Sequence, residues 1–476
     1  MSEQKVQARE PRKPKLWEAL LSFAALIGVM SIGIAVFEVD PHIPMLIGSA
    51  FAAVVALCLG YSWKHIEKGM FDGIYQALQA VIILAIIGVL VGVWLVSGVV
   101  PTMIYYGLKI ITPALFLVAS LLTCSITSLA TGTSWGTIGT IGIALMGVAS
   151  GLGIPLPMAA GAIISGAYFG DKMSPLSDTT NLAPAMAGTD VFTHVKFMLR
   201  STVPVYIIVT VIYLLIGLRF AGDNTDMVNI KIITDGLESA FNINPFLLIP
   251  PLVVIISIAL KMPAIPGIFL GIITGGLLGA IVQGSSFGDL LDCAYNGFVS
   301  ETGVEAIDDL LTSGGLNNMM YSISLTILAM MFGGIMECTG QLEVIVSQLI
   351  KLAKGVTSLV TLTVFTCVGS NACMPEQYIS IVVPGRMYNA SYRKRGLHPK
   401  MLSNALESAG TVTSALVPWN TCGVYIYGVL GVGALSYAPW AFFNYLMPLA
   451  VIIMTALGML TVKVEDDPAT VIAVNN

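Results

Sequence analysis

The sequence is short of charged residues. Only 10% of its 476 residues are charged, whereas soluble globular domains carry about 25%. No basic run suggests nucleic acid as a partner, and 56% of the residues are hydrophobic. This composition predicts an all-α polytopic membrane protein that is embedded in a lipid bilayer.

Clusters of reactive or metal-binding residues are also missing. The seven cysteines and four histidines are scattered, with no CxxC pair, so we predict neither a disulfide framework nor a transition-metal site. No P-loop is present for ATP-driven pumping, and no nucleophile–base arrangement points to an intramembrane enzyme. The first apolar run, "LWEALLSFAALIGVMSIGIAVF", is too long for a signal peptide and is interpreted as a retained membrane helix.

Long apolar runs dominate the chain. Two apolar regions, 106–190 and 357–435, are each interrupted twice by polar residues. Uninterrupted runs long enough to cross about 30 Å of hydrocarbon lie near 17–37, 43–62, 74–97, 201–220, 246–262, 265–283, 319–339 and 440–462. The interruptions are "SLATGTSWGT" (128–137), "GDKMSPLSDTTNLAP" (170–184), "GSNACMPEQY" (369–378) and "VPWNTCG" (417–423).

The two interrupted regions are related by a shift of 243 residues. The shift aligns Pro175 with Pro418, and the same shift pairs Ser128 with Asn371, Thr133 with Glu376 and Ser177 with Asn420. A second relation concerns charge: loop 61–70 is basic where its counterpart 284–318 is acidic, and loop 151–156 is uncharged where 391–400 is basic. Because Lys and Arg mark the cytoplasmic side, corresponding loops are expected on opposite sides, as in inverted-topology repeats.

The predicted organisation follows from these repeats. Each repeat is expected to hold one re-entrant hairpin, around 128–137 or 369–378, and one broken membrane helix. Segments 38–42 and 98–105 are predicted outside, and 191–200 inside. The predicted parts are a cytoplasmic N-terminal tail (1–16), repeat 1 (17–220), an extracellular linker (221–244), repeat 2 (245–462) and a cytoplasmic C-terminal tail (463–476).

Polar residues at the breaks indicate a binding site. Broken helices survive at membrane depth only inside protein or beside water, and inverted-repeat transporters bind substrate and coupling ion there. Hydroxyl, amide and carboxylate oxygens, such as those of "SDTTN" (177–181), are the ligands that hard cations prefer. A carboxyl group in such surroundings can hold a proton or a sodium ion, but not both. The carboxylate candidates within or beside apolar spans are Asp171, Asp178, Glu376 and Glu407.

Each candidate also has a structural interpretation. Asp171 can form a local charge pair with Lys172, Asp178 can cap the resumed helix, and Glu376 can cap the returning arm of its hairpin. The stripe of Ser403, Glu407, Thr411 and Ser414 lies on one helical face, which favours a bundle-facing functional role. Arg386 is expected to reach the cytoplasmic interface, with binding of a substrate carboxylate as the alternative.

At "GAYFGDKMSPLSDTTNLAP" and "SLATGTSWGTIGTIG" the chain resembles the NhaC family of bacterial Na⁺/H⁺ antiporters. The resemblance implies transport of Na⁺ and H⁺ across the bacterial inner membrane, with both termini cytoplasmic. Some members exchange malate and protons for lactate and Na⁺, so a carboxylate exchanger stays the alternative, and a homodimer is left open. The resemblance implies two half-sites. One comprises Ser128, Thr131, Thr133, Ser134, Asp178, Thr179 and Asn181, and the other comprises Asn371, Glu376, Asn420 and Thr421.

The residue pattern adds Asp171, Ser177 and Glu407 to these half-sites. The expected Na⁺ ligands are Asp178, Thr179, Glu376 and Asn420. Inverted repeats with broken helices favour alternating access over a channel.

Overall fold

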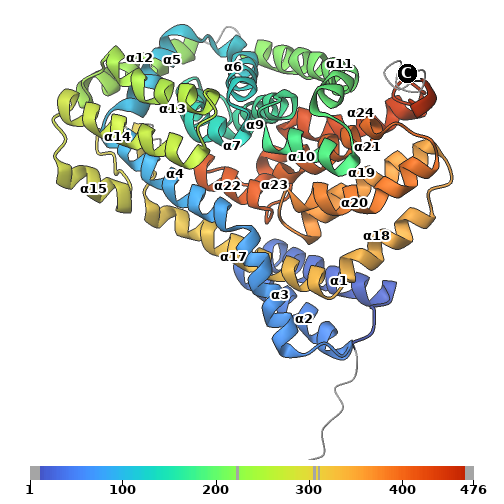
Figure 1. The fold of residues 1–476 in the computed structure, drawn as a ribbon. Helices are drawn as coiled ribbons and strands as arrows, with labels where there is room; N and C mark the ends of the chain where they lie inside the picture. Colours follow the sequence, from blue (N-terminus) through green and yellow to red (C-terminus); the bar gives the residue numbers. More distant parts are fainter. Residues whose placement is uncertain (1–10, 221–223, 304–306, 309–310, 467–476) are drawn as a thin grey trace, which may run out of the picture.

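Because lipid offers no hydrogen-bond partners, a membrane-embedded backbone pairs within its own segment, and this chain is helical throughout the part that the structure describes. The computed structural model (Figure 1) describes residues 11–220, 224–303, 307–308 and 311–466. Within these ranges the only β-type pairing is two isolated bridges. Most of the predicted N-terminal tail, part of the linker and residues 467–476 lie outside the described residues.

The first half begins with α1 and ends with η3, and η2 is a π-helix. Its helices are α1 (Leu16–Ala35), α2 (His42–Cys58), α3 (Trp63–Gln76), α4 (Leu78–Val96), α5 (Val99–Ile110), η1 (Pro113–Leu115), α6 (Phe116–Thr131), α7 (Ser134–Thr137), η2 (Ile138–Gly142), α8 (Ile143–Gly151), α9 (Leu156–Met173), α10 (Asp178–Ala187), α11 (Val191–Gly217) and η3 (Leu218–Phe220).

The second half begins with α12, and η5 is a π-helix. Its helices are α12 (Asn224–Ala240), η4 (Pro245–Leu248), α13 (Ile249–Ala259), α14 (Ala264–Val282), α15 (Phe287–Asn296), α17 (Leu316–Cys338), α18 (Gln341–Lys351), α19 (Val356–Cys373), α20 (Ile379–Lys394), α21 (Pro399–Leu406), η5 (Glu407–Thr411), η6 (Ser414–Leu416), α22 (Thr421–Leu430), α23 (Ala434–Tyr437), η7 (Ala438–Trp440), α24 (Phe442–Ala456) and η8 (Val464–Asp466).

The multi-pass membrane architecture is confirmed. Seven helices of the described chain are long and apolar enough to cross a membrane. The number rises to nine if two sharply bent helix pairs are each counted as one span. These pairs are Ile230–Ala240 with Pro245–Ala259, bent by 102°, and Thr421–Leu430 with Ala434–Trp440, bent by 88°. Every predicted span overlaps a helix.

Five segments that were predicted as connections contain helix instead. Residues 61–70 lie mostly in α3, 98–105 mostly in α5, 191–200 in α11 and the described part of 221–244 mostly in α12, and the predicted loop 284–318 contains α15. In α3 the Ser62 hydroxyl caps the first turn, and Ile66 is buried on the face that packs against α17. The polar residues that suggested a loop occupy the other face of this amphipathic helix.

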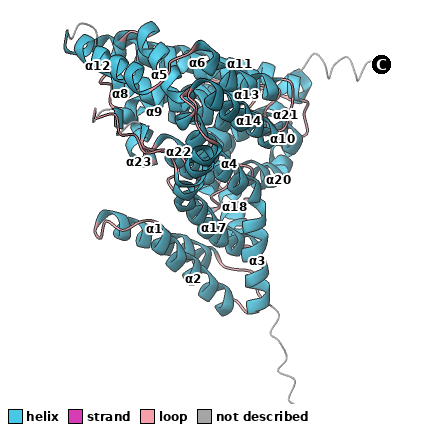
Figure 2. Cartoon of the chain, turned by 90° about the vertical axis from the view of Figure 1, so that its left-hand side faces the viewer, coloured by secondary structure: helices cyan, strands magenta, loops and turns pink. Residues whose placement is uncertain are grey.

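The two halves pack against each other in a reciprocal way. Helices α2 and α3 pack on α17 with α1 on α2, while α14 and α15 pack on α4 with α13 on α14. Figure 1 shows α17 running beside α4, from the region of α15 to the group α1–α3, and Figure 2 shows α1 and α2 set apart from the remaining helices, with α3 next to α17. A separate apolar cluster, which includes Leu26, Met45 and Phe332, joins this group to α17.

Helices α4 and α17 are antiparallel. Gly88 of α4 contacts Met319 in the first turn of α17, and Gly73, just before α4, contacts Gly334 near the end of α17. The glycines let the two backbones approach closely, as small residues do between membrane helices. Residues 61–70, which lie mostly in α3 and carry two lysines and one glutamate, are therefore at one end of this helix pair, and acidic α15 is at the other.

All four predicted polar interruptions are breaks between helices. We call residues 132–133 tip 1, 174–177 break 1, 374–378 tip 2 and 417–420 break 2. Break 1 precedes α10 and break 2 precedes α22, and these two helices begin and end 243 residues apart. The sequence shift therefore coincides with helix boundaries.

Candidate functional site

In each half the tip contacts the break of the same half. A methyl group added to Gly132 in tip 1 would lie 2.8 Å from the Leu176 carbonyl carbon and 2.9 Å from the Ser177 nitrogen in break 1. In the second half Thr421, the first residue after break 2, donates its N–H to the Pro375 carbonyl of tip 2 at 2.9 Å. The backbones of tip and break therefore lie close together in the first half, and in the second half a backbone hydrogen bond joins tip 2 to the residue that follows break 2.

The helices that lead into the tips are fastened by matching hydrogen bonds. The Ser128 hydroxyl donates to the Ala167 carbonyl at 2.6 Å, and the Asn371 amide donates to the Gly410 carbonyl at 2.8 Å. Both donors and both acceptors are related by the 243-residue shift. The same structural role thus recurs with a hydroxyl in one half and an amide in the other.

An aromatic residue just after tip 1 and another at the end of tip 2 each contact the opposite half. The Trp135 ring stacks on Tyr425 of α22, with ring centroids 4.2 Å apart, and the Tyr425 hydroxyl donates to the Trp135 carbonyl. The shift relates Trp135 to Tyr378, whose hydroxyl donates to an Asp178 carboxylate oxygen of α10 at 3.4 Å. These cross-contacts bring the four interruptions into one region.

Asp171 lies buried at the end of α9. The Ser134 hydroxyl, which follows tip 1, donates to an Asp171 carboxylate oxygen at 2.6 Å. The Thr180 hydroxyl donates to the carbonyls of Asp171 and Lys172 and so fastens the start of α10 to the end of α9. Carboxylate and hydroxyls from both sides of break 1 therefore converge.

Glu407 is fully buried at the start of the π-helix η5. The Thr179 hydroxyl of α10 donates to Glu407 Oε1 at 3.1 Å, while Oε2 has no hydrogen-bond partner among the described residues. The predicted bundle-facing stripe is confirmed, since Ser403, Glu407, Thr411 and Ser414 are all buried. A π-helical turn often marks a functional position, because it displaces side chains from regular helical register.

The buried Lys172 does not pair directly with Asp171, so that structural interpretation is wrong. Among the described residues Lys172 forms no ion pair within 4.0 Å; its ammonium donates to the Ser408 hydroxyl at 2.9 Å and to the Met198 sulfur at 3.1 Å. Ser408 is next to Glu407, and Glu407 interacts electrostatically with Lys172 and with Asp171. One buried cation therefore accompanies two buried carboxylates contributed by different halves.

The second half contributes mainly amides around tip 2 and break 2. The Asn420 amide donates to the Asn371 carbonyl and side-chain oxygen, and Asn420 Oδ1 caps α22 by accepting from the Cys422 N–H. Glu376 is buried, and its carboxylate accepts from the Tyr378 N–H at 2.8 Å, as a local cap does. Thr421 is buried beside Asn420.

The remaining candidates differ in exposure. Asp178 and Asn181 are exposed, and the Asn181 amide donates to the carbonyls of Pro175 and Ser177. Thr131 is buried, Ser177 is buried against Thr179, and the half-buried Thr133 caps α7. Of the four expected Na⁺ ligands, Asp178 and Glu376 both accept from Tyr378, whereas Thr179 donates to Glu407 and Asn420 donates to Asn371.

Neutral oxygens are needed for any cation site here. In the described chain no group of three His, Cys, Asp or Glu side chains comes close enough to hold a metal ion. All seven cysteines, which lie in described segments, are free. A sodium ion held by one or two carboxylates would be completed by hydroxyl, amide or carbonyl oxygens, which suit hard cations.

Several residues near the carboxylates were not identified from the sequence as part of the site. The Ser408 hydroxyl, which accepts from Lys172, donates to Asn404 at 3.2 Å, and the buried His194 ring contacts the Ser403 hydroxyl at 2.8 Å. Gln377 donates to the Thr411 carbonyl at 3.4 Å. The stripe beginning at Ser403 was the only signal pointing to this region, and nothing local pointed to His194.

The chain is similar to known proteins over most of its length. The family model described as the Na⁺/H⁺ antiporter family matches residues 166–459. The chain is 38% identical to the Na⁺/H⁺ antiporter NhaC of Alkalihalophilus pseudofirmus, covering 94% of this chain and 97% of the relative. It is 37% identical to the malate-2H⁺/Na⁺-lactate antiporter of Bacillus subtilis, covering 92% of this chain and 93% of the relative. It is also 37% identical to the arginine/ornithine antiporter ArcD of Halobacterium salinarum, covering 94% of this chain and 93% of the relative.

Proposed function

Because the chain belongs to the Na⁺/H⁺ antiporter family, we propose that it exchanges Na⁺ for H⁺ across the bacterial inner membrane by alternating access. The observation that carries this proposal is Glu407, a fully buried carboxylate with one oxygen that lacks a hydrogen-bond partner among the described residues. A buried carboxylate needs a cation, a proton or a hydrogen bond, and here a transported ion supplies it.

The proposed site lies between Glu407 and Asp171. Thr179 links Glu407 to break 1, and Ser134 links Asp171 to tip 1. Two carboxylates in one buried region repel each other unless a proton or a cation lies between them. Lys172 offsets one of the two charges, so a single Na⁺ or H⁺ balances the other. Na⁺ and H⁺ therefore compete, and Na⁺ binding weakens as the pH falls because protons occupy the same carboxylates.

The function is tested by a Na⁺ pulse applied to proteoliposomes that contain a pH dye and no organic acid. We expect a Na⁺-dependent pH change that the pulse does not produce in protein-free vesicles. If the pH changes only when malate or lactate is supplied, the Na⁺/H⁺ proposal is wrong.

The alternative in that case is a Na⁺-coupled carboxylate exchanger. Two relatives that are 37% identical over more than 90% of this chain are antiporters of malate and lactate or of arginine and ornithine. Their substrates carry carboxylates, so family membership alone leaves the organic substrate open.

We also propose that the two halves are inverted-topology repeats. The proposal is supported by the antiparallel packing of α4 and α17 and by the opposite net charges of residues 61–70 and α15, which lie at opposite ends of this pair. By the positive-inside rule residues 61–70 and 391–400 are cytoplasmic, and α15 is external.

This topology predicts opposite accessibility for two single cysteines. In a cysteine-free background, the exposed Leu291→Cys in α15 and Lys394→Cys at the end of α20 should react with an impermeant maleimide from opposite sides. Right-side-out and inverted vesicles measure the two sides separately. Labelling of both positions from the same side would overturn the inverted arrangement.

A further inference from the structure

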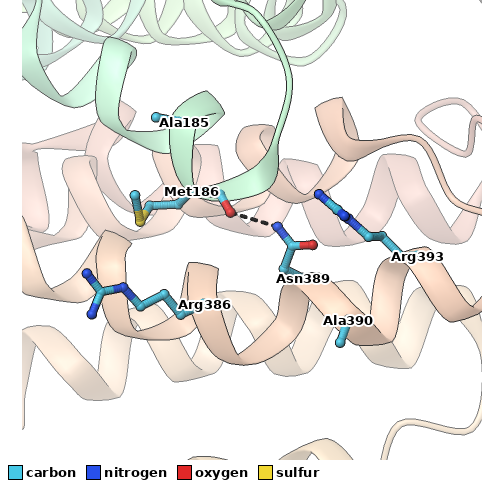
Figure 3. A pocket seen from close by; sticks show the side chains of 6 residues that line it. All are labelled: Ala185, Met186, Arg386, Asn389, Ala390 and Arg393. Carbon is cyan, nitrogen blue, oxygen red and sulfur yellow. Dashed lines mark hydrogen bonds between the residues drawn. The ribbon is translucent and has the colours of Figure 1, made fainter.

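A groove lies between the C-terminal end of α10 and the face of α20 that it packs against. It has a volume of about 430 Å³, within the range of about 300–1,000 Å³ typical of small-molecule sites. Figure 3 shows Arg386 and Arg393 on either side of Asn389 along α20. The residues lining the groove are Ala185, Met186, Arg386, Asn389, Ala390 and Arg393.

Asn389 fixes the shape of this groove. Its amide donates to the Met186 carbonyl at 2.8 Å and to the Ala187 carbonyl at 3.0 Å. These are carbonyls of the last turn of α10, where the chain leaves the helix through Gly188 in a left-handed conformation. Because Asn389 satisfies this helix end, α10 and α20 are held at a fixed separation.

The two arginines of the groove are available to a ligand. Both side chains are exposed, and among the described residues neither guanidinium makes a hydrogen bond or an ion pair. Arg386 and Arg393 are seven residues apart, so they lie on one face of α20 about two turns from each other. The Arg393 guanidinium lies close to Gly188, which follows the C-terminal end of α10. A positive charge is favourable there because the C-terminal end of a helix carries a partial negative charge.

The groove has no charged counterpart in the first half. The 243-residue shift that relates α10 to α22 relates Arg386 to Ile143, Asn389 to Met146 and Arg393 to Ser150. Helix α22 contacts α8, where these three residues lie, so the matching helix contact exists without cations. The positive charge is therefore specific to one side of the molecule and is not required by the shared packing.

From these observations we infer that Arg386 and Arg393 form a binding site for a small oxyanion at the mouth of the groove. The shared chemistry is an oxygen anion held by guanidinium groups, which bind carboxylates and phosphates through paired hydrogen bonds. A free carboxylate such as malate or lactate and the phosphate of an anionic lipid both present this group. The site is independent of the cation site at Glu407.

The test measures binding to the purified protein by calorimetry in a zwitterionic detergent. Malate, lactate and inorganic phosphate are the soluble probes, and short-chain phosphatidylglycerol and phosphatidylcholine, dissolved in the same detergent, are the lipid probes. The double variant Arg386→Gln/Arg393→Gln removes both guanidiniums. Lys394→Gln is the matched control, because Lys394 is an exposed cation on the same helix that does not line the groove.

We expect at least one oxyanion probe to bind, with the double variant weakening it at least tenfold and Lys394→Gln leaving it within twofold. Loss confined to malate or lactate identifies a free carboxylate, and loss confined to phosphatidylglycerol identifies a lipid headgroup. Absence of all binding, or equal weakening by both variants, overturns the site. The Na⁺-driven pH change of the same preparations, measured without organic acid, reports separately on the proposed function.

Discussion

Replacing Glu407 with glutamine is expected to reduce Na⁺-dependent proton movement to the level of protein-free vesicles. Glutamine keeps the size of the side chain and can still accept from Thr179, but it carries neither a charge nor an exchangeable proton. Because Glu407 is fully buried between the halves, no water or exposed carboxylate replaces it. The measurement is the dye signal after a Na⁺ pulse, at equal protein per vesicle.

Glu337→Gln is the control for this variant. It makes the same chemical change at an exposed position near the end of α17, where the carboxylate contacts only Gln76 among the described residues. Transport by Glu337→Gln should stay within about twofold of the unmodified protein, as is usual for changes away from a site. Near-normal transport by Glu407→Gln would remove Glu407 from the mechanism.

Asp178→Asn, at an exposed position, is expected to raise the Na⁺ concentration needed for half-maximal transport and to leave the maximal rate largely intact.

Replacing Gly132 with alanine is expected to abolish transport while the protein still inserts. Gly132 ends α6 with φ at +72°, and a Cβ there would lie within 3 Å of the backbone of break 1. Since the opposing atoms are backbone, they cannot rotate away, and tip 1 and break 1 must separate. Asp171 and Ser134 would then lose their 2.6 Å contact.

Gly431→Ala separates this effect from backbone strain. Gly431 ends α22 with φ at +70°, and no atom lies within 4 Å of a Cβ at this position. Both alanines therefore carry the same left-handed penalty of roughly 1–2 kcal/mol. Transport lost in Gly132→Ala and kept in Gly431→Ala supports the contact between tip and break. Equal loss in both would assign the effect to strain alone.

Much of this architecture is predictable from local features of the sequence. Proline and clustered polar residues at Pro175 and Pro418 locate the two breaks, because proline lacks an amide hydrogen and polar side chains are costly in lipid. Helical spacing of Ser403 and Glu407 predicts their common buried face. Helices α3 and α12 were mistaken for connections because polar residues on one face masked an apolar face that another helix covers.

The partners of the site residues were less predictable. Lys172 and Ser408 are 236 residues apart, and no local pattern shows that their side chains meet. Adjacency in sequence suggested a pair between Asp171 and Lys172, whereas the two side chains turn to different halves. The composition of "SDTTN" identified this segment as part of a site. It does not reveal that Asp178 is exposed, whereas its neighbour Thr179 faces Glu407.

Competition between Na⁺ and H⁺ for one buried carboxylate site is tested most directly by counting the protons released on Na⁺ binding. Purified protein in weakly buffered detergent receives NaCl or choline chloride, and a pH electrode records the release. We predict that Na⁺ releases protons from the unmodified protein, that choline does not, and that Glu407→Gln releases far fewer. Binding of radioactive Na⁺ to the unmodified protein without any proton release would contradict the competition.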